Sequence, residues 1–327
     1  MSEGPMSAAP DPVAPAPWCG PAPSGAFRLH TPAERLDAEG CLARLPSGTT
    51  GTLGARVDAF FAARPAGPAL LVGALPFDPH ADDALYQPER QVVATPGSRD
   101  DRAWLRPNAA VAEPSEADYA AAVSRCMARL GQADDPQALH KVVLARSLRV
   151  ETATPVDPQR LAARLGEDAS VTTYVVPLPV TAAEAPAWLV GATPELLVSR
   201  RGTAVVSHPL AGSARRWHDP ARDGAAAKAL LASAKDHDEH RHVVEAILGT
   251  LAPLCSRLHA PVAPSLHATR TMWHLGTRIE GTLKDPAVSA AMLAGLLHPT
   301  PAVCGTPRLP ALEAIRALEP VDRGFYA

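Results

Sequence analysis

The sequence predicts an α+β fold in which large antiparallel β-sheets are flanked by helices. Between residues 171 and 207, four short apolar segments follow one another with turns between them, a pattern typical of antiparallel strands. Segments with a helical period lie between these runs of strands and do not alternate with single strands. No GxGxxG or GKS/T phosphate-binding loop is present, so a doubly wound nucleotide-binding fold is disfavoured.

Composition indicates a globular protein of one or two domains. The chain has 327 residues, of which 46% are hydrophobic, and this is enough to bury a sizeable core. A net charge of −3 gives no basic field, so neither nucleic acid nor an anionic membrane is expected as a partner. No apolar run approaches the ~20 residues of a membrane span. Five cysteines without a CxxC pair favour a reducing compartment, and we expect a cytoplasmic protein.

The chain divides into three parts by composition. Residues 1–25 are rich in proline and alanine and are predicted to form a disordered tail. Residues 26–112 mix short apolar runs with Gly and Pro, so we expect strands and loops without a helical period, forming the N-terminal part of the α+β lobe. Residues 113–327 carry every motif that suggests chemistry.

Within this last part, the apolar periods predict the following elements. Ser115 caps a helix that ends near residue 131, and Asp157 begins a short helix that ends at residue 165. A single long helix is expected at about 221–254, and another at 286–297. Predicted strands occupy residues 141–150, 171–176, 187–191, 196–199, 203–207 and 273–283.

Charged residues interrupt the apolar pattern of the long helix. Asp236, Glu239 and His240 are spaced i, i+3, i+4, so they share one helix face and could meet a cation. For an arbitrary charge run, a solvated face is the commoner explanation. A zinc site formed by three histidines is weaker still, because their spacing matches neither HExxH nor a zinc finger; these histidines are His237, His240 and His242.

Seven blocks of sequence, taken in order, identify a family, although each is weak evidence alone. They are KVVLAR (141–146), GATPELLVSR (191–200), HPLAGSARR (208–216), SAKDHDEH (233–240), MWHLGTRIEG (272–281), LHPTPAVCG (297–305) and EPVDRGFYA (319–327). Together, over residues 115–327, they resemble the chorismate-utilising enzymes, specifically isochorismate synthase. The resemblance implies the chorismate-binding fold of anthranilate synthase component I.

The resemblance also implies an isomerase that converts chorismate to isochorismate. Family members that add water carry a lysine at the position of Lys141, and members that use ammonia lack it. Lys141 would be the general base that activates water for carbon 2, and Glu195 the general acid for the departing carbon 4 hydroxyl. The pocket must then lower the pKa of the lysine and raise that of the glutamate. Lysine is rare here, with four in the chain, and arginine could not act as this base.

The same resemblance implies Mg²⁺ as the cofactor, with Glu239 as a ligand near the substrate's ring carboxylate. Glycine lets the backbone approach a substrate closely, and a pocket histidine is as common a structural residue as a substrate contact. The expected substrate-binding residues are Ala211, Gly212, Ser213, His274 and Thr277.

In the family, the sequence continues beyond the position of Ala327 into strands that carry a second magnesium carboxylate, an arginine and a tyrosine. The resemblance therefore implies that the chain is truncated at its C-terminus, and we expect the 327-residue polypeptide to be poorly active and unstable, because central strands would lack partners.

We expect a monomer. A catecholate siderophore pathway or menaquinone synthesis could use the product. A salicylate synthase and a non-catalytic chorismate-binding protein are the alternatives.

Overall fold

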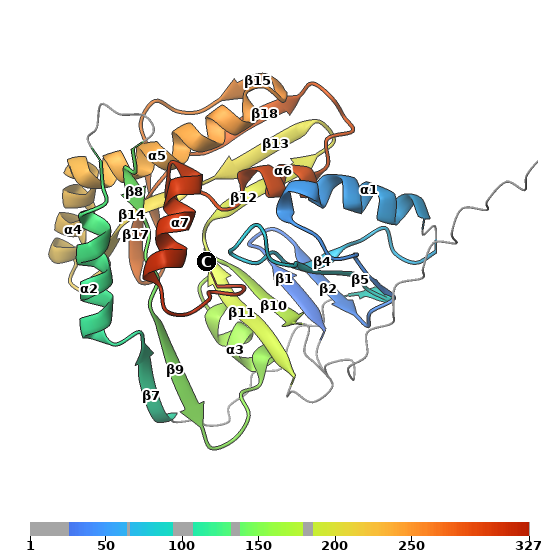
Figure 1. Cartoon of the computed structure of the whole chain (residues 1–327), viewed down its shortest axis with the longest axis horizontal. Coiled ribbons are helices and arrows are strands. Elements are labelled where there is room, and N and C mark those ends of the chain that lie inside the picture. The colour runs from blue at the N-terminus through green and yellow to red at the C-terminus, as the bar shows by residue number, and fades with distance from the viewer. Residues whose placement is uncertain (1–25, 64–65, 94–106, 132–137, 179–185, 327) are drawn as a thin grey trace, which may run out of the picture.

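Antiparallel strand pairing organises the protein, and this confirms the predicted α+β class (Figure 1). The computed structural model describes residues 26–63, 66–93, 107–131, 138–178 and 186–326, so the predicted tail at 1–25 lies outside the described residues. Within the described part, each strand pair is antiparallel. No helix there combines the length and the apolarity needed to cross a lipid bilayer.

The largest sheet joins the N-terminal part of the chain to its middle. Its strands, in the order β11-β10-β1-β2-β6, are β11 (Ala187–Thr193), β10 (Thr172–Leu178), β1 (Phe27–His30), β2 (Arg35–Glu39) and β6 (Arg90–Val92). A smaller sheet contains β3 (Ala43–Arg44), β5 (Ala84–Gln87) and β4 (Val72–Ala74). Helix α3 (Pro158–Leu165) packs on β10 and β11. The direction of β11, which leads into Glu195, is therefore fixed by pairing with β10.

Two further sheets support the helices at the other end of the molecule. The first contains β12 (Leu196–Arg201), β13 (Ala204–His208), β18 (Ile279–Leu283) and β15 (Cys255–His259). The second contains β14 (Leu210–Arg215), β17 (Met272–Gly276) and β16 (Ser265–Ala268). Helices α4 (Pro220–Ala232) and α5 (Ala234–Leu251) pack on β14 and β17.

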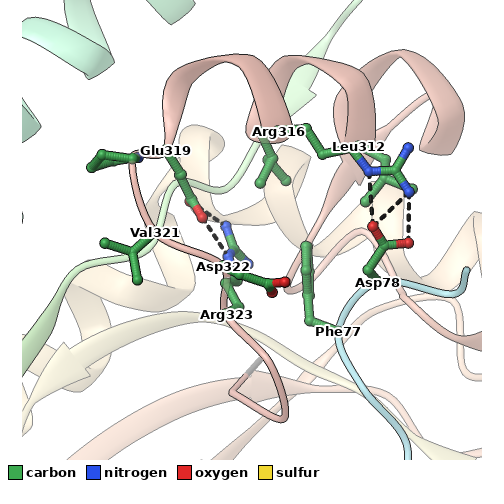
Figure 2. Close-up of a pocket in the computed structure, with 10 residues that line it drawn as sticks. Phe77, Asp78, Leu312, Arg316, Glu319, Val321, Asp322 and Arg323 are labelled. Carbon is green, nitrogen blue, oxygen red and sulfur yellow. Dashed lines mark hydrogen bonds and ion pairs between the residues drawn. The ribbon is translucent and has the colours of Figure 1, made fainter. Parts of the chain in front are cut away.

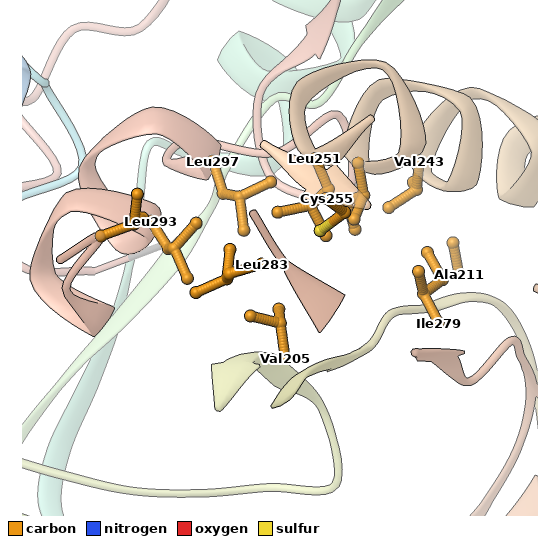
Figure 3. Close-up of a cluster of buried hydrophobic side chains, with 11 residues drawn as sticks. Val205, Ala211, Val243, Leu251, Cys255, Ile279, Leu283, Leu293 and Leu297 are labelled. Atoms are coloured by element: carbon orange, nitrogen blue, oxygen red, sulfur yellow. The ribbon is translucent and has the colours of Figure 1, made fainter. Parts of the chain in front are cut away.

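The main hydrophobic core lies where α5 meets these sheets (Figure 3). Val243 and Leu251 of α5 are fully buried against Leu283 of β18. Helix α6 (Ala290–Leu297) contributes Leu293 and Leu297 to the same cluster. Burial of such side chains is the main favourable contribution to folding, so the core fixes α5, which carries Glu239.

Some of the remaining elements contact the chain segment that begins with Lys141, and the others pack elsewhere. Helix α7 and helix α2 are in contact, and α1 packs on α6. These elements are η1 (Thr50–Thr52), α1 (Leu53–Ala63), β7 (Pro107–Glu113), α2 (Glu116–Met127), β8 (Lys141–Val142), β9 (Ser147–Thr152), β19 (Gly305–Thr306) and α7 (Arg308–Leu318). Strand β8 pairs with β19, and β9 pairs with β7.

The prediction of one strand at 141–150 is wrong, because the segment forms β8 and β9 in two different sheets. Between β8 and β9, polar groups from residues distant in sequence replace the hydrogen bonds that a neighbouring strand would make. The Val143 N–H donates to the Cys304 carbonyl at 2.8 Å, and the Ala145 N–H donates to the Glu319 carboxylate at 2.6 Å. These partners satisfy the backbone in a conformation that periodicity does not reveal.

The single long helix at 221–254 is also wrong, since Ser233 divides it into α4 and α5. Ser233 is extended, and its hydroxyl accepts a hydrogen bond from the Asp236 N–H, which caps α5. The predicted strand 273–283 likewise divides into β17 and β18, which belong to different sheets. The helix expected at 286–297 begins at Ala290 because Ser289 caps it. The cap of α2 at Ser115 is confirmed, as is the short helix α3.

Residues 26–112 contain helix α1, whereas the sequence predicts no helical period there. Leu53, Val57 and Phe60 are buried on one side of α1, so packing stabilises a helix whose sequence has only a weak periodic signal. The four described cysteines, at 41, 126, 255 and 304, are free thiols. The division at 112 into two parts stays a prediction.

Substitution within α6 should test the contribution of the main core to stability. Leu293 is fully buried, whereas Leu296 on the same helix is 38% exposed. Leu293→Ala should lower the free energy of unfolding by about 3 kcal/mol through lost burial and a cavity, and Leu296→Ala should lower it by less than about 1 kcal/mol. Urea denaturation measures both, and equal losses would contradict this account of the core.

Candidate active site

Lys141 is the first residue of β8, and its side chain lies in a polar niche between α5 and the segment that precedes β19. Its Nζ donates a hydrogen bond to the Pro301 carbonyl at 2.6 Å and lies 3.6 Å from Oε1 of Glu239. The side chain is only 14% exposed. Burial lowers the pKa of Lys141 below its usual range, although the nearby Glu239 carboxylate opposes the shift. This direction is the one that a lysine acting as a base requires.

A buried ion pair between Glu319 and Arg323 holds the segment that follows Lys141. The two side chains are 9% and 4% exposed, and their closest atoms are 2.6 Å apart. Arg323 donates to the carbonyls of Val143 at 2.6 Å and Val303 at 2.9 Å, while Glu319 accepts from the Ala145 N–H. One ion pair therefore connects both chain segments that form the β8–β19 pair.

Figure 2 shows this ion pair beside a pocket of about 240 Å³ that also exposes the Asp78–Arg316 ion pair. Lys141, Glu195 and Glu239 do not line this pocket, so it is separate from the predicted acid and base. Glu319 and Arg323 lie in the block EPVDRGFYA (319–327), but the sequence analysis assigns them no role. The signal in the sequence for this ion pair was the spacing of Glu319 and Arg323, two oppositely charged residues four positions apart.

Glu195 lies in the turn between β11 and β12. Its backbone N–H donates to Oγ1 of Thr193 at 3.1 Å, which fixes the turn. Burial raises the pKa of the Glu195 carboxyl to about 7, although a hydrogen bond from the backbone of Leu210 and the charge of Lys141 oppose the shift. The pKa values of Glu195 and Lys141 are thus shifted in opposite directions within reach of each other's charge, which is typical of an acid/base pair.

Glu239 lies on α5 between two ammonium groups. Oε1 lies 3.6 Å from Nζ of Lys141, and Oε2 lies 3.5 Å from Nζ of Lys235. The carboxylate is 30% exposed, so a cation and its waters can reach it. Hard carboxylate oxygens at a position that already attracts positive charge fit Mg²⁺. The described residues contain no group of three or more His, Cys, Asp or Glu that could hold a metal ion, so substrate oxygens and water would have to complete the coordination.

The histidines of α5 do not form the zinc site considered from the sequence. Nε2 of His240 is 2.7 Å from Oγ1 of Thr277, and burial lowers the pKa of this imidazole to about 4. His237 contacts the Leu231 carbonyl, and His242 lies 3.7 Å from Asp238. The three rings have separate partners, and His240 and Thr277 are both buried, so they connect α5 to the end of β17.

Strand β14 places the expected substrate-binding residues opposite β17. Ser213 pairs with His274, and its Oγ is 2.8 Å from Nδ1 of that histidine. Gly212 has a φ of +79°, and a Cβ there would lie 3.0 Å from Cβ of Asp236, so only glycine fits without strain. The Ala211 side chain is buried in the main core, which leaves only its backbone for a ligand.

The structure thus brings Lys141, Glu195 and Glu239 together, and separately pairs Ser213 with His274. The two groups are connected through β14, because the backbone of Leu210 donates to Glu195 and Gly212 lies against α5. Thr277 contacts His240 and is buried. The Pro301 carbonyl that binds Lys141 was missed, since a backbone acceptor leaves no mark in the side-chain pattern.

Comparisons with known proteins show which family the chain resembles. The family model described as chorismate binding enzyme matches residues 81–327. The isochorismate synthase DhbC of Bacillus subtilis (strain 168) is 40% identical over 321 residues, which cover 92% of this chain and 78% of that protein. The crystal structure of Bacillus anthracis DhbC, assigned as a 2,3-dihydroxybenzoate-specific isochorismate synthase, has a TM-score of 0.83 at 38% identity and covers 92% and 79% of the two chains.

The predicted fold is confirmed by a more distant likeness. Anthranilate synthase component I of Streptococcus pneumoniae TIGR4 has a TM-score of 0.53 at 15% identity, and the match covers 100% of this chain and 82% of that one. At this identity the likeness concerns the fold alone. The family model, in contrast, spans most of the described residues, and its match includes Lys141, Glu195 and Glu239. The chain belongs to the chorismate binding enzyme family.

Proposed function

We propose that the protein is an isochorismate synthase, an isomerase that converts chorismate to isochorismate. One observation carries the proposal: a lysine and a glutamate, both partly buried and with pKa values shifted toward each other, lie together in a chain of this family. The names of the similar proteins support the same activity. Neutral lysine and protonated glutamate are the forms that addition and loss of water need near pH 7.

In the proposed reaction, Nζ of Lys141 accepts a proton from water as the oxygen forms a bond to ring carbon 2. The ring double bonds shift, and the carbon 4 hydroxyl leaves as water with the proton of Glu195. One water enters and one leaves, so the reaction is an isomerisation. The Pro301 carbonyl holds Nζ at 2.6 Å and so directs the lone pair of the neutral amine away from this carbonyl. Positioned groups of this kind accelerate proton transfer by roughly 10²–10⁴-fold.

We propose that Glu239 is a ligand of the Mg²⁺ that the family implies. When bound, the ion would neutralise the ring carboxylate of chorismate while electron density moves through the ring. Glu239 contributes carboxylate oxygens that face two ammonium groups. A bound cation would weaken the attraction between Glu239 and Lys141, and this would favour the neutral amine.

Ser213, His274 and the backbone at Ala211 and Gly212 are proposed to orient the substrate. The hydrogen bond between Ser213 and His274 fixes both side chains on one face of the β14–β17 pair. Thr277 is proposed to act through His240, which it contacts, because both are buried. A catecholate siderophore pathway is the proposed destination of the product, supported by the 2,3-dihydroxybenzoate assignment of the B. anthracis protein. The monomeric state and the cytoplasmic location stay predictions.

Product analysis with chorismate and Mg²⁺ should test the proposed activity. We expect isochorismate, and Lys141→Ala should lower kcat/KM by at least about 10²-fold because the base is lost. Lys141→Arg should be equally impaired, since arginine keeps the charge but cannot accept the proton. Lys228→Ala, an exposed lysine of α4, serves as the control. Salicylate with pyruvate would favour the rival synthase, and chorismate binding without turnover would favour a non-catalytic protein.

The raised pKa of Glu195 should appear in protein stability. The ordinary pKa of this carboxyl is 4.5, and in the folded protein it is about 7. Between these two pH values, folded Glu195 holds a proton that the unfolded chain has released. This group therefore makes the free energy of unfolding fall as pH rises from 4.5 to about 7. Glu195→Gln removes the effect. The increase in the free energy of unfolding of Glu195→Gln over that of wild type should be small at about pH 4.5 and reach about 3 kcal/mol at about pH 8.

Urea denaturation across this pH range measures the difference between Glu195→Gln and wild type. Glu313→Gln changes an exposed carboxyl of α7 and should show no comparable gain with rising pH. A gap for Glu195→Gln that stays constant from about pH 4.5 to about pH 8 would contradict the assignment of a raised pKa, whatever the catalytic outcome.

Calorimetry of chorismate binding should test the role of Glu239 without depending on turnover. Mg²⁺ should tighten chorismate binding to wild type by at least about five-fold, as expected for coupled ligands. Glu239→Gln should lose most of this enhancement because a carboxylate ligand is removed. Glu245→Gln, an exposed change on the same helix, should retain it. Full enhancement in Glu239→Gln would refute the ligand assignment.

A further inference from the structure

Two histidines outside the proposed acid/base pair face each other across two sheets. His208 is the last residue of β13, and His267 lies in β16. Their Nε2 atoms are 3.2 Å apart, whereas their ring centroids are 4.3 Å apart. The ring planes cross at 73° in an edge contact, and the Nε2 atoms are the sides of the two rings that lie nearer to each other than the centroids do.

This separation suits two nitrogens that share one metal ion. Imidazole nitrogens lie about 2.0–2.1 Å from zinc and similar ions, so two of them at right-angled or tetrahedral positions are roughly 2.9–3.4 Å apart. The observed 3.2 Å falls within this range. Oγ of Ser265 is 3.0 Å from Nε2 of His267, so an oxygen donor is also at hand.

The backbone around the pair is fixed, and one position is shaped to receive a ring. His267 pairs with His274 across β16 and β17, and His208 pairs with Leu196 across β13 and β12. A Cβ at Gly276 would lie 2.5 Å from Cδ2 of His267, so glycine leaves the space that this ring occupies. Such rigid placement favours a site over a chance contact.

The charge state also suits metal binding. Burial lowers the pKa of His208 and of His267, and each neighbouring ring or cation adds to the effect on His208. Both imidazoles are therefore neutral near pH 7, the form that ligates metals. Arg278 is the nearby cation, and its repulsion would weaken binding without blocking Nε2.

We propose that His208 and His267 bind one late first-row divalent ion, such as Zn²⁺, Ni²⁺ or Cu²⁺, through their Nε2 atoms, with Ser265 and water completing the coordination. Imidazole ligands favour these ions, whereas Mg²⁺ prefers oxygen. Because β13 and β16 belong to different sheets, the ion would connect the two sheets and stabilise the folded state. This site is separate from the Mg²⁺ proposed at Glu239.

Titration calorimetry of the full chain with Zn²⁺ or Ni²⁺, without chorismate, tests the proposal independently of the proposed activity. We expect one site per chain in wild type, and a loss of affinity of at least about ten-fold in both His208→Gln and His267→Gln. His259→Gln, an exposed histidine on β15, should bind as wild type does. Mg²⁺ should give no heat that depends on His208.

Two further measurements complete the test. Zn²⁺ should raise the melting temperature of wild type, and far-UV circular dichroism should show that each variant is folded before it is titrated. Cu²⁺ electron paramagnetic resonance should show two coordinated nitrogens in wild type and one in either variant. Absence of binding in wild type, or equal affinity in wild type and a folded variant, would overturn the proposal and leave a hydrogen-bonded histidine pair.

Discussion

The buried ion pair between Glu319 and Arg323 is the constraint on which the proposed site depends. It satisfies backbone groups at Val143, Ala145 and Val303, where no strand ladder is formed. A buried pair of charges is stable only when further hydrogen bonds compensate the loss of water, and removing one partner typically costs about 3–5 kcal/mol. Here the compensation is the backbone that leads into and out of the β8–β19 pair, so the same bonds that stabilise the charges also position Lys141.

The three groups of the proposed site depend on one another electrostatically. Burial lowers the pKa of Lys141 and so favours its neutral form, but the Glu239 carboxylate at 3.6 Å favours its charged form. Burial raises the pKa of Glu195 by more than the charge of Lys141 lowers it, so the net shift is upward. The charge state of Lys141 therefore depends on the charge next to Glu239, and under the proposed role of Glu239 a bound cation would favour the neutral amine.

Sequence reasoning succeeded where information was local or where the family motif was long. The caps at Ser115 and Asp157 and the runs of strands are confirmed because they depend on neighbouring residues. The resemblance placed Lys141, Glu195 and Glu239 in one site, and the structure brings them together. Their roles rest on the resemblance and on geometry, and not on spacing in the sequence, since Lys141 and Glu239 are far apart along the chain.

The failures have two physical causes, which are hydrogen bonding between residues distant in sequence and a capping side chain in the middle of a helical period. The strand expected at 141–150 is interrupted because Glu319, 174 residues from Ala145, provides an acceptor. The long helix is divided because the Ser233 hydroxyl competes with the helical bond and caps α5. That division has a consequence for the site. A new N-terminus at Ala234 places Glu239 within two turns of a helix start, and its side chain extends toward Lys141 from a second, separately capped helix.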